Sequence, residues 1–209
     1  MKTPVPCFVL ILLWLCALQI AHATPALNGA LPNASSVPVY GLFELTVGIA
    51  TQYANPFDPD QIDVGSDFAG PDGRVIHVNG FWMQNYTRSL SGDGREVLTP
   101  SRDPLWKIRF APTTPGVWRY TVTARDASGS TTPPASVLHV TTSTDPGFVG
   151  VSKRNPRAFA FPGDRPYFAI GEDMCWPSSK LQTYSYDSWI PKLHAAGGQL
   201  DPRVELAPL

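Results

Sequence analysis

Short segments in which apolar and polar residues alternate recur about every ten residues between positions 37 and 142, with turn residues between them. The clearest of them is VWRYTVTARD, at 117–126. The 22 prolines and 17 glycines of the chain favour short strands and many turns over long helices. About seven strands, with no helix-period window between them, predict a mainly β protein. This spacing is typical of an antiparallel β-sandwich of the immunoglobulin-like type, which we place at residues 37–142.

The N-terminal residues predict an export signal followed by a leader. Lys2 precedes an almost wholly apolar run, Phe8–Ile20, and Ala21-His22-Ala23 fits a signal cleavage site. We therefore expect residues 1–23 to be a signal peptide, the mature protein to be secreted or periplasmic, and no membrane contact to remain after cleavage. Residues 24–36 are small and polar with two prolines, which predicts a flexible leader.

The pattern changes after the predicted sandwich. Residues 143–165 predict a linker that contains a small hairpin. Tyr167–Ile170 is a continuous apolar run, typical of a strand buried on both faces. Tyr186–Ala196 can form an amphipathic helix closed by two glycines, and RVELAPL (203–209) starts like another strand. We therefore interpret residues 166–209 as the first βαβ portion of a TIM-type barrel, truncated because a closed barrel needs roughly 200 residues.

The chain resembles a known family in four segments: NPFDP, GFWMQNY, the block from Trp106 to Trp118, and GEDMCW. The family is an N-terminal β-sandwich domain of unknown function that precedes a (β/α)8 glycoside hydrolase-like barrel in secreted, mainly bacterial proteins. The resemblance covers about residues 39–200. It implies a carbohydrate-active protein in which the sandwich is an accessory module.

The resemblance also bears on catalysis. In similar barrels, two carboxylates at the ends of later strands hydrolyse the O-glycosyl bond. No position of this chain matches either strand, so the resemblance supplies no catalytic residue and the chain is predicted to be inactive. We interpret the chain as the accessory module of a secreted glycoside hydrolase-like protein. The alternative is a stand-alone secreted module that binds carbohydrate without catalysis or has a structural role.

Four residues are candidates for contact with a polysaccharide or oligosaccharide partner. Glu172 and Asp173 lie where the first barrel strand would end, facing the catalytic mouth, and the alternative for them is a polar strand end. Trp176 and Trp82 offer flat aromatic faces that suit the C–H face of a pyranose. The alternative for Trp176 is packing at the barrel mouth.

Other partners and cofactors are not expected. The net charge is −1 and there is no basic run, so nothing points to nucleic acid. The acidic stretch from Asp58 to Asp67 lacks the spacing of a calcium-binding loop, and the four histidines show no zinc spacing. We predict neither a metal site nor a cofactor.

Overall fold

The computed structural model of the chain describes residues 24–174 and 176–198. The predicted signal peptide and the predicted strand at 203–209 lie outside these residues. The described part is mainly β, with fifteen short strands and one α-helix. No helix within it is long and apolar enough to cross a bilayer.

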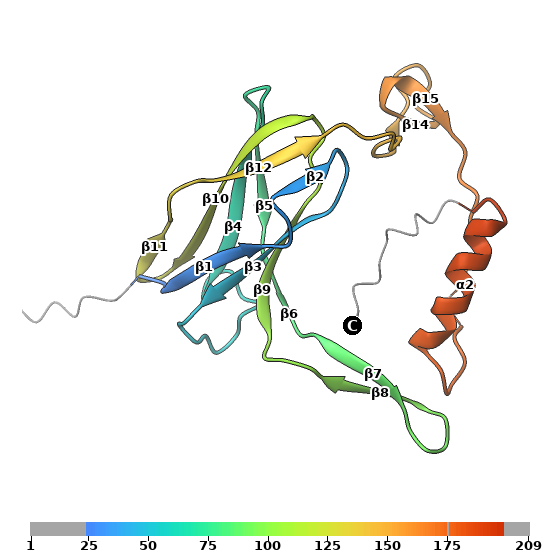
Figure 1. Cartoon of the computed structure of the whole chain (residues 1–209), viewed down its shortest axis with the longest axis horizontal. Coiled ribbons are helices and arrows are strands. Elements are labelled where there is room, and N and C mark those ends of the chain that lie inside the picture. Colours follow the sequence, from blue (N-terminus) through green and yellow to red (C-terminus); the bar gives the residue numbers. More distant parts are fainter. Residues whose placement is uncertain (1–23, 175, 199–209) are drawn as a thin grey trace, which may run out of the picture.

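Two sheets make up the larger part of the molecule (Figure 1). The first is antiparallel and has the order β1 (Leu27–Pro32), β3 (Phe43–Ile49), β9 (Leu105–Phe110) and β6 (Phe81–Met83). The second has the order β2 (Ser36–Pro38), β12 (Ser136–Thr141), β10 (Gly116–Asp126), β4 (Asp63–Ala69) and β5 (Val75–Asn79), and β11 (Gly129–Thr131) pairs with β10. Its neighbours are antiparallel, except that β2 and β12 run parallel.

The core lies between these two sheets. Alternate residues of β3, β9, β10 and β12 are buried, as the two-residue period of a strand requires. Aromatic rings meet across the gap: the Phe43 and Phe68 rings have centroids 6.2 Å apart, and those of Phe110 and Trp118 are 5.1 Å apart. The prediction of a mainly β protein with antiparallel sheets is confirmed.

The predicted flexible leader at 24–36 is wrong for most of its length. Residues 27–32 form strand β1, which pairs with β3, and Ser36 begins β2, which pairs with β12. Both strands lie at the edges of their sheets, where a proline such as Pro32 is tolerated because one side of the backbone needs no partner. The small and polar residues of 24–36 are therefore compatible with ordered edge strands.

A hairpin that the sequence pattern did not indicate extends from the two sheets (Figure 1). Its strands are β7 (Tyr86–Leu90) and β8 (Glu96–Pro100), paired antiparallel as a separate two-stranded sheet. Both strands are largely exposed, so they lack the regular burial pattern that marks the core strands.

The C-terminal part contains a small sheet and a helix. Strand β14 (Phe159–Phe161) pairs with β13 (Gly150–Val151) and, across the 3₁₀ turn η1 (Pro162–Asp164), with β15 (Arg165–Tyr167). Helix α2 (Thr183–Ala195) contains Pro191. The predicted doubly buried strand is wrong: only Tyr167 pairs, antiparallel, and Phe168 and Ile170 are 80% and 49% exposed. Among the described residues, no parallel strand pairs with Tyr167–Ile170, so the run is not buried in a sheet.

Candidate functional site

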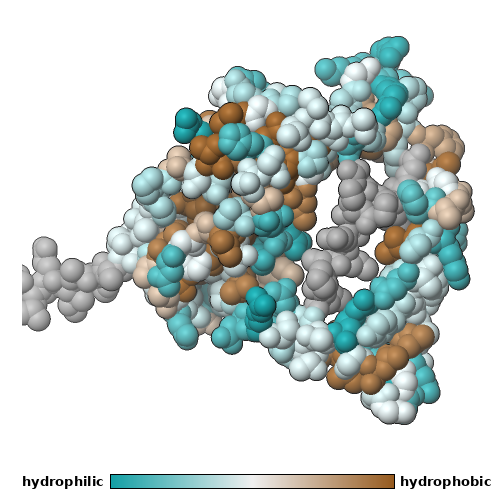
Figure 2. Space-filling view, viewed as in Figure 1, coloured by the Kyte–Doolittle hydropathy of each residue, from teal (hydrophilic) through white to brown (hydrophobic). Residues whose placement is uncertain are grey.

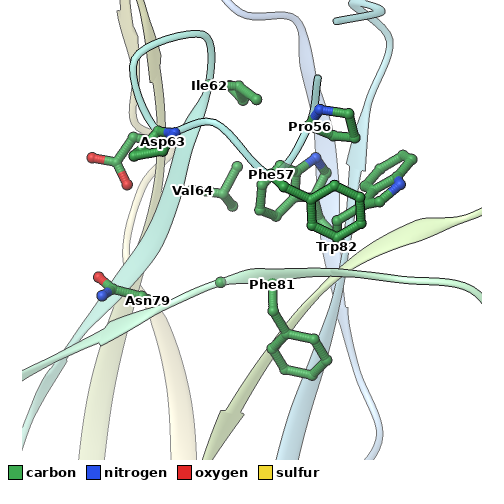
Figure 3. Close-up of a pocket in the computed structure, with 11 residues that line it drawn as sticks. Pro56, Phe57, Ile62, Asp63, Val64, Asn79, Phe81 and Trp82 are labelled. Atoms are coloured by element: carbon green, nitrogen blue, oxygen red, sulfur yellow. The ribbon is translucent and has the colours of Figure 1, made fainter. Parts of the chain in front are cut away.

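An aromatic groove lies at one end of the two sheets, between the loop before β4 and the connection from β5 to β6. Its volume is about 570 Å³. Figure 3 shows Pro56, Phe57 and Trp82 gathered at one side of this hollow, with Asp63 and Asn79 at the other. We call it the Trp82 groove.

Gly80 makes the chain cross from one sheet to the other at the base of the groove. Its N–H donates to the carbonyl oxygen of Val64 at 2.6 Å, and a Cβ at this position would lie 2.9 Å from that same oxygen. Successive residues of β6 then point to opposite faces. Trp82 turns towards Trp106, with ring centroids 5.6 Å apart. The Arg109 guanidinium lies over the Phe81 ring, 5.1 Å from the ring centroid.

The other wall is a loop held in place by its own side chains. The Asn55 carboxamide accepts a hydrogen bond from the N–H of Phe57 (3.1 Å), and the Asp58 carboxylate accepts one from the N–H of Asp60 (3.0 Å). Ile62, 1% exposed, anchors the end of the loop in the core. These contacts fix the backbone of the loop at Phe57, which is 73% exposed. The Asp58 carboxylate therefore stabilises a turn of this loop.

The polar side of the groove is already engaged in hydrogen bonds. The Asp63 carboxylate pairs with Arg125 at 2.9 Å, and the Asn79 carboxamide oxygen lies 3.1 Å from Nε2 of His77. Among the described residues that line the groove, Asp63 is the one carboxylate. Because glycoside hydrolysis uses a pair of carboxylates, this arrangement can bind a ligand with polar and apolar faces but has no acid and nucleophile pair.

A second hollow, of about 450 Å³, lies beside α2. Three of the four residues predicted from sequence line it together: Glu172, Asp173 and Trp176. Helix α2 adds Trp189 and Lys192, which the sequence interpretation did not include. Trp176 is 87% exposed, so its indole is not packed in the described structure. Figure 2 shows apolar residues at the surface of both the two-sheet part and the part that carries α2.

The structure therefore separates the predicted site residues into two places. Trp82 lies in the aromatic groove, and the other three lie beside α2. The sequence interpretation missed Phe57, which lines the same groove as Trp82. The available signal was an aromatic residue one position after a proline in the turn-rich NPFDP segment, where no strand could bury it.

Comparisons with known proteins give a family match and a distant structural neighbour. Residues 36–125 match the family model described as "Domain of unknown function (DUF5060)". No curated protein matches the chain. The chain is similar to a solved structure described as a "putative glycoside hydrolase" from Bacteroides vulgatus ATCC 8482, with 20% identity and a TM-score of 0.44. That similarity covers 66% of this chain and 22% of the other, so the chain spans about a fifth of that protein's length.

Proposed function

We propose that this chain is a non-catalytic accessory module, an immunoglobulin-like β-sandwich, of a secreted carbohydrate-active protein, and that the Trp82 groove binds a polysaccharide or oligosaccharide. The observation that carries the proposal is the pair formed by Phe57 and Trp82 beside a single carboxylate, Asp63. The resemblance of the NPFDP and GFWMQNY segments supports it, since these segments supply the two aromatic residues.

The groove suits a sugar for physical reasons. A pyranose has an apolar C–H face, which packs on aromatic rings, and an edge of hydroxyl groups, which need hydrogen-bond partners. Phe57 and Trp82 offer the apolar surface, and the polar groups at the opposite side are Asp63, which also pairs with Arg125, and Asn79, which is also hydrogen-bonded to His77. Because the loop that carries Phe57 is held by its own hydrogen bonds, little ordering free energy is needed on binding.

The non-catalytic part of the proposal rests on the carboxylates. The groove holds one, and the second hollow holds Glu172 and Asp173, which are consecutive residues. We assign Glu172, Asp173 and Trp176 a contact with the same sugar class, subsidiary to the Trp82 groove. The signal-like pattern of residues 1–23 supports secretion.

The proposal is tested by binding of the mature chain to a panel of insoluble polysaccharides and soluble oligosaccharides. We expect retention on at least one of them. Phe57→Ala, which removes an exposed ring, is expected to weaken binding about tenfold or more, as is Trp82→Ala. Phe148→Ala, which removes a ring that is 58% exposed outside the groove, serves as the matched control.

Three results would overturn the proposal. Failure of every glycan to bind the wild-type chain, or equal binding by the wild type and both groove variants, would remove the function assigned to the groove. Hydrolysis of aryl glycosides above a buffer control would contradict its non-catalytic nature.

A further inference from the structure

The β7–β8 hairpin contacts the first turn of α2 through one carboxylate. Oε2 of Glu96 accepts hydrogen bonds from the backbone N–H groups of Thr183 (2.7 Å) and Tyr184 (3.4 Å), and Oε1 accepts one from the Thr183 hydroxyl. The first N–H groups of a helix have no partner within the helix, so this carboxylate caps α2 from another element. Its negative charge also lies at the positive end of the helix dipole.

Arg88, on the other strand of the hairpin, adds a second contact. Its guanidinium pairs with the Asp187 carboxylate at 3.0 Å and donates to the Thr183 hydroxyl at 3.2 Å. The same group lies 4.5 Å from the centroid of the Tyr184 ring. The Arg88 side chain is 29% exposed, so these interactions are partly shielded from water.

Backbone atoms complete the contact. The N–H of Glu96 donates to the carbonyl oxygen of Lys180 (2.7 Å), and the Lys180 ammonium donates to the carbonyl oxygen of Asp93 (3.3 Å). The hairpin therefore holds both the segment that enters α2 and the first turn of the helix.

Helix α2 has little support of its own. Gln182, at the N-cap position, has a φ of 33° and makes no capping hydrogen bond through its side chain. The helix is 13 residues long, a length that is marginal in isolation, and it contains Pro191. Apart from Asp187, its first two turns consist of aromatic, hydroxyl and β-branched residues, which favour helices weakly.

We propose that the β7–β8 hairpin is a docking arm whose partner is the segment 178–195 of the same chain, which it caps and orders. Through this arm the two-sheet unit sets the position of the polypeptide that follows residue 178. This assignment is independent of sugar binding.

Hydrogen–deuterium exchange of the whole mature chain tests the proposal. In Glu96→Ala, the amides of 183–195 are expected to exchange about fivefold faster or more, with β10 unchanged. Arg88→Asp is expected to act in the same direction, and adding Asp187→Arg to it is expected to restore protection in large part. Asp72→Ala, which removes a carboxylate from the β4–β5 turn paired with Arg74, is the matched control.

Unchanged exchange of 183–195 in Glu96→Ala would overturn the assignment. Faster exchange that reached β10 to the same extent would overturn it as well, because Glu96 would then support the whole fold. If Asp187→Arg did not restore protection to Arg88→Asp, the Arg88–Asp187 pair would not contribute to ordering α2.

Discussion

The ring of Phe68 in β4 stacks on the ring of Phe110 in β9, with centroids 4.0 Å apart and planes inclined by 14°. Because β4 and β9 belong to different sheets, this contact joins the two layers at the centre of the core. Phe43 meets Phe68 from the neighbouring strand β3, so the layers are held by a cluster of rings. Since the described residues outside the sheets are held by few buried side chains, stability should be concentrated here.

Phe68→Ala is expected to reduce the free energy of unfolding by about 3–5 kcal/mol, because it removes a fully buried ring and leaves a cavity between the sheets. Urea denaturation followed by tryptophan fluorescence measures the loss. Val75→Ala, at a residue 63% exposed on the adjacent strand β5, should change stability by less than about 0.5 kcal/mol. Equal losses in the two variants would contradict this description of the core.

Gly80→Ala is expected to cost about 1–3 kcal/mol, because the added Cβ would lie 2.9 Å from the backbone oxygen of Val64 and the crossing between sheets would have to shift. Thermal unfolding gives the comparison. Gly92→Ala is the control, since a Cβ at Gly92 meets nothing within 4 Å. If the two variants were equally stable, the close approach at Gly80 would not constrain the base of the groove.

Glu44 should make stability depend on acid pH. Burial opposes its ionisation, but hydrogen bonds from Lys107 (2.6 Å) and Arg109 (2.7 Å) outweigh that effect and hold the pKa of Glu44 below its ordinary value of 4.5. A lowered pKa in the folded state means that the contribution is present above the unfolded pKa and is lost as the pH falls through the folded value. The free energy of unfolding should therefore decrease as the pH falls below 4.5.

Glu44→Gln tests this dependence. The variant is expected to lose roughly 1.5 kcal/mol at neutral pH, where the charged hydrogen bonds are formed, and to lose less than the wild type on acidification. Glu172→Gln, at an exposed carboxylate, is the control for the loss at neutral pH and should change the free energy of unfolding by less than about 0.5 kcal/mol there. Parallel acid profiles of the wild type and Glu44→Gln would contradict the prediction.

The Tyr53 phenol should ionise at a higher pH than an ordinary tyrosine. Its burial, together with the hydrogen bond from its hydroxyl to the Asp126 carboxylate (2.8 Å), raises the pKa of Tyr53 from 10.0 to about 12. Because the neutral phenol is favoured in the folded state, this contribution to stability is complete below pH 10.0 and is lost as the pH rises towards 12. Tyrosinate absorbance should show a late component that is absent in Tyr53→Phe.

Asp126→Asn separates the effect of the Asp126 carboxylate on the pKa of Tyr53 from the effect of burial. The late component should move towards pH 10.0 in this variant, because the negative charge that disfavours ionisation is removed. A tyrosinate titration identical to that of the wild type would show that Asp126 does not act on Tyr53.

Sequence alone determined the strands that build the core. In β9, Trp106, Ile108 and Phe110 alternate with charged residues, and the structure buries all three. This period is local, since successive side chains of any strand point to opposite faces. The helix predicted near the C-terminus is also present, beginning at Thr183 rather than Tyr186, because its spacing is a local property as well.

Only the tertiary structure decided what depends on a distant partner. Leu27–Pro32 became a strand because β3 supplies its hydrogen bonds, and Tyr167–Ile170 did not become a buried strand because no described segment covers it. Phe57 lines the same groove as Trp82, and Glu96 caps Thr183, between segments far apart in the chain. The periodicity of side chains within a segment shows which of its residues face the core. It does not show which distant segment will supply hydrogen-bond partners or the opposite wall of a groove.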